Sequence, residues 1–338
     1  MFGRNKKSKG DLHPAELFDT GLLTCTRCGA EIPFADEPPL SIVPCPKCEQ
    51  GRNFVPMCID EFWLFAPLGG GGMGSVYEAY VREDPTQLAA VKILPREKKN
   101  DPILINGLRA EAATIEQLGH NPCIVSGLGS GFADNEHFLA MEYVQGERLD
   151  KRIQRLYRLP ELEVILVALR LLQAETHIYN QGYLYRDMKP ENVIVNRQGA
   201  FLFDYGICIP LEQALSDQGD MVSGSPIYWP PERVIGDPEL CASEIYSLGM
   251  VIYHALQGEP YFHAKEIEAM ARKHVRTVRL SDFERKMKKL RPDIAKLIAR
   301  MIEREPEDRY QSFAQVEDEL LQILAARLNE MDLAGANQ

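Results

Sequence analysis

The chain has 338 residues, of which 45% are apolar and 26% are charged, a composition typical of globular proteins. Its net charge of −11 argues against general nucleic-acid binding, which requires a basic surface, so no nucleic-acid partner is expected. No stretch approaches the ~20 uninterrupted apolar residues that span a bilayer, and the basic start of the chain lacks the apolar run of a signal peptide. We therefore expect no membrane segment and a cytoplasmic location.

Four of the eight cysteines form two CxxC pairs, Cys25 with Cys28 and Cys45 with Cys48, which residues 29–44 separate. This spacing is typical of a four-thiolate zinc site, because each CxxC turn directs two sulfurs toward one tetrahedral ion. Four unrelated buried thiols are the alternative, and the paired pattern disfavours them. Four protein ligands would leave no open position for catalysis, so we expect a structural or partner-binding role. An S₄ site also accepts iron, and zinc is preferred on prior grounds only.

A glycine-rich segment follows a short predicted strand, and its template positions are Leu68, Gly69, Gly71, Gly74 and Val76. Backbone without side chains can close over phosphates, which is the purpose of the G-x-G-x-x-G-x-V pattern. Taken alone, the pattern also suits a tight hairpin or a dinucleotide-binding loop. A strand-like stretch follows at residues 76–81, where the dinucleotide-binding fold requires a helix, and this disfavours that fold.

Lys92 interrupts the apolar strand pattern of residues 88–94. A lysine in such a strand needs a partner or a ligand, because a buried unpaired charge is strongly unfavourable. Glu111, in the helical stretch of residues 104–118, is the best candidate partner. Glu116 is the competing acid, but it lies five positions further on, near the end of the helix.

The most informative stretch is residues 185–192, which read Tyr-Arg-Asp-Met-Lys-Pro-Glu-Asn, with Asp204 twelve positions after Asn192. Phosphoryl transfer needs positioning and charge neutralisation more than covalent help from the protein. Asp187 is suited to accept a proton and Lys189 to neutralise phosphate charge. Asn192 and Asp204 offer the hard oxygen ligands that magnesium prefers.

These motifs, in this order, resemble those of bacterial serine/threonine protein kinases of the eukaryotic type, over about residues 59–324. The resemblance implies an α+β, bilobal protein-kinase-like fold, with a small β-rich amino-terminal lobe and a large helical carboxy-terminal lobe. A small four-cysteine, zinc-ribbon-like module would precede the two lobes. The expected segments are a basic flexible tail (1–20), the zinc module (21–57), the two lobes (58–144 and 145–326) and a carboxy-terminal tail (327–338).

The resemblance further implies ATP-dependent transfer of the γ-phosphate to serine or threonine hydroxyls of a protein substrate, with autophosphorylation. Lys92 and Glu111 would position the α- and β-phosphates, and Asp187 and Lys189 would act at the transferred group. Asn192 and Asp204 would hold Mg²⁺. By the same resemblance the adenine pocket consists of the apolar side chains of Leu68, Val76, Ala90 and Ile194 and the backbone groups of Glu142 and Val144.

Two positions depart from the kinase pattern: Tyr185 stands where histidine is usual, and Glu244 where aspartate is usual. They keep open the alternative of a pseudokinase, a nucleotide-binding signalling scaffold without transfer. Every position that handles phosphate charge is intact, which favours the enzyme. A small-molecule kinase is disfavoured by a complete docking-loop motif at residues 224–232, whose Glu232 is expected to pair with Arg309.

Regulation is left open by the sequence. One hypothesis is that phosphorylation of Ser216 or Ser223 orders the activation loop through Arg186. The equally weighted alternative is that these serines only form turns. A protein partner at the zinc module and a homodimer formed through the amino-terminal lobe also remain open.

Overall fold

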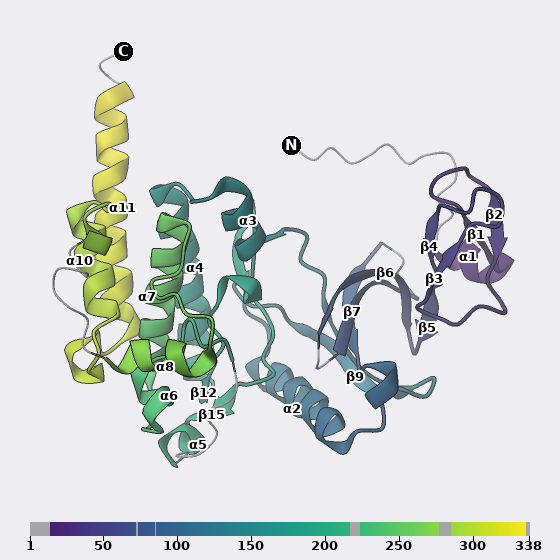
Figure 1. Ribbon diagram of the computed structural model, residues 1–338, viewed down its shortest axis with the longest axis horizontal. Coiled ribbons are helices and arrows are strands. Elements are labelled where there is room, and N and C mark those ends of the chain that lie inside the picture. The colour runs from purple at the N-terminus through teal and green to yellow at the C-terminus, as the bar shows by residue number, and fades with distance from the viewer. Residues whose placement is uncertain (1–13, 72–73, 85, 217–223, 277–284, 336–338) are drawn as a thin grey trace. The chain divides into compact units, whose positions relative to one another are not determined.

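The computed structural model describes residues 14–71, 74–84, 86–216, 224–276 and 285–335 (Figure 1). The chain forms two compact units. The first runs to Ala112 and includes Ser126–Tyr143, and the second consists of Ala113–Val125 and the chain from Val144 onward. The first unit is rich in strands and the second is mainly helical, so the expected α+β class is confirmed.

The cysteine-rich part of the first unit is built from short elements: α1 (Pro14–Thr20), β1 (Leu22–Thr24), β2 (Glu31–Pro33), β3 (Ile42–Pro44) and β4 (Arg52–Phe54). Strand β1 pairs with β2 and β3 with β4, both antiparallel. Their small core contains Cys25 and Cys45 among a few apolar side chains. The segment expected as a flexible tail ends in a helix, α1, while residues 1–13 lie outside the described part of the chain.

A six-stranded antiparallel sheet forms the rest of this unit, in the order β5 (Met57–Ile59), β6 (Phe62–Gly71), β7 (Gly74–Val81), β8 (Leu88–Ile93), β10 (Glu136–Glu142) and β9 (Gly127–Ala133). The 3₁₀ turn η1 (Arg96–Lys98) and helix α2 (Pro102–Leu118) follow β8. Successive residues of a strand face opposite sides. In β8 the side chains of Ala89, Val91 and Ile93 are buried in the apolar core. Ala90 and Lys92 therefore share the other face.

The cysteine-rich module packs on the core face of this sheet. Leu40 packs against the apolar cluster of the sheet, and the rings of Phe54 and Tyr77 lie with centroids 5.8 Å apart. Only Val55 and Pro56 separate β4 from β5, and Val55 is fully buried. The module is consequently continuous with the sheet, on the side opposite Lys92.

The second unit contains β11 (Glu147–Arg148), α3 (Leu149–Leu156), α4 (Glu161–Asn180), β12 (Tyr183–Leu184), η2 (Pro190–Asn192), β13 (Val193–Asn196), β14 (Gly199–Leu202), β15 (Ile209–Pro210), α5 (Leu211–Ser216), α6 (Pro231–Ile235), α7 (Cys241–Gln257), α8 (Ile267–Val275), α10 (Pro292–Met301), η3 (Pro306–Asp308) and α11 (Phe313–Gly335). Helix α4 packs against α7 and α11 (Figure 1). Helix α11 continues to Gly335, where the sequence analysis expected a tail from residue 327. Within the described ranges, no helix is both long and apolar enough to cross a membrane.

Residues 113–125 belong to the helical unit, although the expected boundaries placed them in the amino-terminal lobe. The reason is a set of backbone hydrogen bonds to β14. The Leu202 N–H donates to the Cys123 carbonyl at 2.8 Å, and the Val125 N–H donates to the Leu202 carbonyl at 2.9 Å. These backbone hydrogen bonds tie the end of the segment to the helical unit, because buried N–H and carbonyl groups need partners.

Candidate active site

Lys92 and Glu111 are brought together as the sequence analysis expected. The Lys92 Nζ lies 2.6 Å from Glu111 Oε2, and the two side chains are 12% and 4% exposed. The pair joins β8 to α2 on the face of the sheet that does not carry the apolar core. Glu116, the competing acid, is exposed on the same helix. The lone lysine in the apolar strand pattern predicted a lysine with a partner, and the structure has this pair.

The glycine-rich segment forms the connection between β6 and β7, whose last described pair is Gly71 opposite Gly74. A Cβ on Gly74 would lie 2.5 Å from the Ile93 carbonyl oxygen, and its φ is +146°, so no other residue fits there. A Cβ on Gly69 would meet no atom within 4 Å. Packing among the described residues therefore does not require glycine at position 69.

The residues expected around adenine fall in both units. In the first, Val76 lies opposite Lys92 in the sheet register, and Ala90 lies opposite Met141. These side chains share the face that carries the lysine, and Leu68 is 44% exposed. Glu142, at the end of β10, donates its backbone N–H to the Ser126 carbonyl at 2.9 Å. The second unit supplies Val144 and Ile194, both partly buried.

Asp187 is the centre of the polar cluster in the second unit. Its Oδ2 accepts hydrogen bonds from Lys189 Nζ at 2.6 Å and from Asn192 Nδ2 at 2.8 Å. Asn192 Nδ2 also donates to the backbone carbonyl of Asp187 at 3.1 Å. The carboxylate, 8% exposed as a residue, is thereby fixed through one oxygen. Its Oδ1 lies near Gly224, where a Cβ would be 3.3 Å away.

The segment that carries Asp204 is tied to the same loop. The Phe203 N–H donates to the Asn192 carbonyl at 3.1 Å. Asp204 and Arg186 both have φ of +67°, a conformation that is unfavourable for residues other than glycine. Non-glycine residues persist in this region only where the surrounding structure imposes it, and such positions cluster at functional sites.

Tyr185, which replaces the usual histidine, is a buried link between these two segments. Its hydroxyl donates to the Phe203 carbonyl at 2.6 Å, and its ring meets that of Tyr205 edge-on, with centroids 6.1 Å apart. Burial raises the pKa of Tyr185 well above its usual value, so the phenol stays neutral. The Tyr205 hydroxyl in turn bonds the backbone of Val125 and Leu202. Both tyrosines therefore hold the backbone that precedes Asp204.

Glu244, the second departure, still supports the catalytic loop. Its Oε1 accepts the backbone N–H of Arg186 at 2.9 Å. The additional methylene of glutamate, relative to aspartate, has therefore not removed this hydrogen bond. The residue lies in the first turn of α7 and is 3% exposed.

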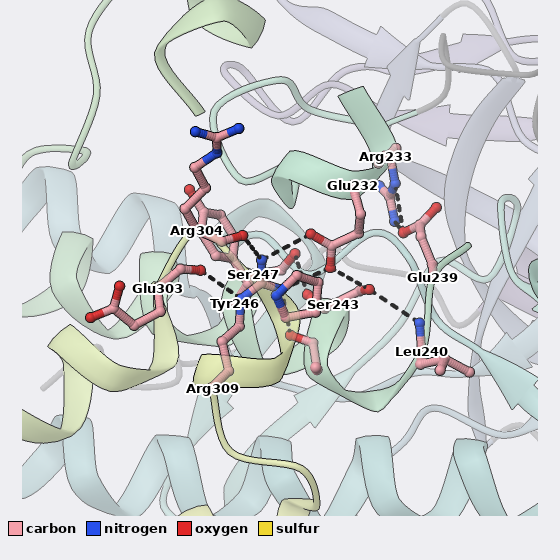
Figure 2. Close-up of polar contacts among 12 residues, drawn as sticks. Glu232, Arg233, Glu239, Leu240, Ser243, Tyr246, Ser247, Glu303, Arg304 and Arg309 are labelled. Atoms are coloured by element: carbon pink, nitrogen blue, oxygen red, sulfur yellow. Dashed lines mark hydrogen bonds and ion pairs between the residues drawn. The ribbon is translucent and has the colours of Figure 1, made fainter. Parts of the chain in front are cut away.

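The Arg186 side chain is already bound to a carboxylate. Arg186 contacts Glu239 Oε1 at 2.7 Å, and Arg233 contacts Glu239 Oε2 at 2.6 Å (Figure 2). Arg233 also donates to the Arg186 carbonyl at 2.7 Å. Two guanidinium groups thus share one buried acid. The two serines proposed to pair with Arg186 cannot be compared with it, because Ser223 and the side chain of Ser216 lie outside the described residues.

Glu232 and Arg309 form the expected ion pair. Arg309 donates to Glu232 at 2.7 and 2.9 Å, and its remaining N–H groups bond the carbonyls of Ala242, Glu303 and Arg304 (Figure 2). All five guanidinium N–H groups are satisfied, which explains how Arg309 is accommodated with 0% exposure. The pair anchors the end of the segment that begins at Gly224 beside Asp187.

The four cysteine sulfurs of the amino-terminal module lie within 4.8 Å of one another. The Cys25–Cys48 and Cys28–Cys45 sulfur pairs are each 3.7 Å apart. Four thiolates at Zn–S distances of ~2.3 Å in a tetrahedron have sulfurs about 3.8 Å apart, so the arrangement fits one metal ion. The backbone N–H groups of Cys28 and Arg27 lower the pKa of Cys25 to about 6, whereas burial and the neighbouring thiols raise the pKa of Cys28 to about 11.

A family model described as the protein kinase domain matches residues 63–321. The chain belongs to the protein kinase domain family. The cysteine-rich module lies ahead of the matched residues, and the kinase domain spans both the sheet and the helical unit.

Three bacterial relatives illustrate the similarity. A probable serine/threonine-protein kinase of Clostridium perfringens is 29% identical over 265 residues, which are 78% of this chain and 38% of the relative. Serine/threonine-protein kinase PrkC of Bacillus subtilis is 30% identical over 274 residues (80% and 42%). Serine/threonine-protein kinase PknB of Mycobacterium leprae is 29% identical over 277 residues (79% and 44%). The chain spans about two fifths of the length of these curated relatives.

Three charged residues near the catalytic loop were not identified from the sequence: Glu175, Arg233 and Glu239. Glu175 had a detectable signal, because it is an acid within the otherwise apolar run of α4. Arg233 directly follows Glu232 in the docking-loop motif and gave no separate signal. Glu239 lies in a short connection before α7, where an acid is usually a solvated surface residue.

Proposed function

We propose that this chain is an ATP-dependent protein serine/threonine kinase. The observation that carries the proposal is the Asp187 carboxylate, which Lys189 and Asn192 hold at one oxygen. The relatives named as serine/threonine kinases support the substrate class, as does a lysine two positions after the catalytic aspartate. Because the chain is much shorter than these relatives, the proposed activity is that of the kinase domain.

In the proposed mechanism, Lys92 binds the α- and β-phosphates of ATP and Glu111 holds the ammonium in place. The 2.6 Å ion pair supports this role, because it fixes a flexible side chain before nucleotide arrives. The glycine-rich segment from Gly69 to Gly74 would cover the phosphates. Leu68, Val76, Ala90 and Ile194 would contact adenine, and the backbone of Glu142 and Val144 would hydrogen-bond it.

Asn192 and Asp204 suit Mg²⁺ by the chemistry of their donors. Asn192 Nδ2 is engaged twice by Asp187, so its Oδ1 is the amide atom left to bind a cation. Hard oxygen ligands supplied sparsely are typical of magnesium sites that nucleotide phosphates complete. Magnesium bound there would neutralise charge on the transferring phosphate.

The substrate hydroxyl is proposed to approach Asp187 Oδ1, since Oδ2 is occupied by Lys189 and Asn192. The hydroxyl oxygen forms the new bond to the γ-phosphorus, the bond from that phosphorus to ADP breaks, and the hydroxyl proton passes to Asp187. Lys189 lies within reach of the same carboxylate and would balance charge on the transferred group. Gly224, beside Oδ1, places the docking segment at this position.

For the amino-terminal module, the proposal is one structural Zn²⁺ bound by Cys25, Cys28, Cys45 and Cys48. A segment this small buries little apolar surface, so metal binding would supply much of its folding free energy. No disulfide joins any of the eight cysteines, all of which are described, and this suits a reducing compartment such as the cytoplasm. A protein partner at the module and a homodimer formed through the amino-terminal lobe are further proposals.

Phosphoamino-acid analysis tests the function. The purified chain is incubated with γ-labelled ATP, Mg²⁺ and a basic protein substrate, and the labelled product is hydrolysed. Label in phosphoserine or phosphothreonine is expected, and it should be absent with Asp187→Asn. Label in phosphotyrosine alone, or none despite retained nucleotide binding, would overturn the proposal, and the latter outcome would indicate a nucleotide-binding scaffold.

A further inference from the structure

Two buried acids, Glu175 and Glu244, lie close enough to interact, and Glu244 also contacts the catalytic loop at Arg186. Glu175 lies on α4 and Glu244 on α7, two helices that pack together, and the residues are 2% and 3% exposed. Among the described residues, neither oxygen of Glu175 has a donor, and of Glu244 only Oε1 has one, the N–H of Arg186. Three buried carboxylate oxygens without a donor are a strongly unfavourable arrangement if both acids are ionised.

The surrounding charges do not neutralise this pair. Arg233 and Arg186 act on Glu244, but both are bound to Glu239, which also faces it. On the Glu175 side the facing titratable group is the Cys241 thiol, and burial raises its pKa to about 12, so the thiol stays neutral and offers no charge that could offset the acids. A proton shared by the two carboxyls removes the repulsion between two charges and supplies a hydrogen-bond donor between them.

We propose that Glu175 is a positioning residue that shares a proton with Glu244, and that this proton keeps the Glu244 carboxylate against the backbone N–H of Arg186. Glu175 then donates as a carboxylic acid and Glu244 accepts both that proton and the Arg186 N–H. Since Asp187 directly follows Arg186, loss of the proton releases the support of the catalytic loop. The inference rests on the proposed kinase function only for its activity readout.

The direction of the pH dependence follows from the pKa shifts. Burial raises the pKa of Glu175 well above its usual value near 4.5 and raises that of Glu244 to about 7. The folded state therefore binds protons that the unfolded state has released. The contribution to stability is complete below the unfolded pKa near 4.5 and is lost as the pH rises through the folded values. Stability should therefore fall as the pH rises from about 4.5 through the folded values, whereas activity, which follows the folded pair, should fall above about pH 7.

The test compares the wild-type chain with Glu175→Gln, whose amide can donate to an ionised Glu244 at every pH. Glu268→Gln, which removes a carboxylate that is 87% exposed, is the matched control. The logarithm of kcat for the wild type and the control should fall with a slope of about −1 per pH unit beyond the upper midpoint. In Glu175→Gln this alkaline fall of kcat should vanish, or its midpoint should move by more than about one pH unit. An unchanged alkaline fall of kcat in Glu175→Gln would overturn the proposal.

Two readouts are independent of kinase activity. Unfolding midpoints in denaturant should fall from about pH 6 to about pH 9 in the wild type and fall less in Glu175→Gln. In folded wild-type protein labelled with ¹³C at the glutamate carboxyl carbon, a glutamate should titrate at or above about pH 7. This second measurement needs no variant, so it holds even if Glu175→Gln does not fold. If every glutamate carboxyl titrates in its ordinary range, the shared proton does not exist, whatever the activity of the chain.

Discussion

Arg309 and Glu232 form a two-point ion pair in the interior of the helical unit, with N–O distances of 2.7 and 2.9 Å. Replacing Arg309 by methionine leaves the Glu232 carboxylate buried, with the Ser243 hydroxyl as its only donor among the described side chains. Breaking a buried pair at one partner typically costs about 3–5 kcal/mol. Chemical unfolding of Arg309→Met should show a loss of this size.

Arg291→Met is the control for that measurement. Arg291 also makes a two-point contact, with Glu330, but these side chains are 48% and 50% exposed. Solvent screens exposed pairs, so the unfolding midpoint should stay close to that of the wild type. Equal losses in the two variants would contradict the account of Glu232 as the buried anchor of the docking segment.

Glu111→Gln tests the orientation of Lys92. The amide keeps the size of the side chain but removes the charge that holds the ammonium at 2.6 Å. We expect phosphoryl transfer to fall by about tenfold or more, because a charge-assisted hydrogen bond contributes about 1.5–3 kcal/mol. Glu116→Gln removes an exposed acid of the same helix and should leave the rate unchanged. The measurement is the initial rate of phosphoryl transfer at saturating substrate, made for Glu111→Gln and Glu116→Gln.

Glu239→Gln tests how Arg186 is held. Because Glu239 already accepts hydrogen bonds from Arg186 and Arg233, phosphatase-treated wild-type protein should transfer phosphate without first modifying its own loop. The variant should lose about tenfold or more in initial rate, through the loss of charge at two arginines. A wild-type protein that is inactive until Ser216 or Ser223 is phosphorylated would instead support the phosphate-dependent alternative.

Metal analysis tests the amino-terminal module. Protein purified without added zinc should contain about one zinc ion per chain, and Cys45→Ser should lose it. Cys58→Ser is the control, since this thiol lies outside the four-sulfur cluster. Leu40 and Phe54 pack the module on the sheet, so loss of metal should also lower the unfolding temperature of the kinase domain. Four freely titrating thiols in metal-free native protein would refute the site.

Tyr185→Phe tests the residue that stands where the kinase pattern usually has histidine. The change removes the hydroxyl that donates to the Phe203 carbonyl at 2.6 Å. A neutral hydrogen bond of this kind contributes about 1 kcal/mol, so a modest loss of stability and less than about tenfold loss of rate are expected. Tyr157→Phe, at a residue that is 66% exposed, is the control. A complete loss of transfer would assign Tyr185 a role beyond positioning.

Much of the site could be predicted because its residues carry local signals. The lone lysine of β8 and the CxxC pairs each require a partner of known chemistry. The structure places Glu111 beside the lysine and brings the four sulfurs together. Helix α4 (Glu161–Asn180) carries local signals of the same kind, since its apolar run is long and Gly182 stands just after its end. Local patterns of this kind need no knowledge of the rest of the fold.

The contacts that were missed join residues distant in sequence. Glu239 meets Arg186 across 53 positions, and no local pattern identifies such a pair. The same holds for residues 113–125, which join the helical unit through backbone bonds to Leu202. Helix α11 extends past the expected tail because Arg327 binds Asp293 at 2.7 Å, a tertiary contact that stabilises its last turns.

Asp187 is proposed to serve phosphoryl transfer rather than nucleotide binding. The most direct measurement is the rate of γ-phosphate transfer by the wild type and by Asp187→Asn, made together with the ATP affinity of each. The amide keeps the contacts at one oxygen but cannot accept the hydroxyl proton. We expect the variant to transfer phosphate at least about a hundredfold more slowly, with nearly equal affinity for ATP. A wild-type chain that binds ATP but transfers no faster than Asp187→Asn would contradict it.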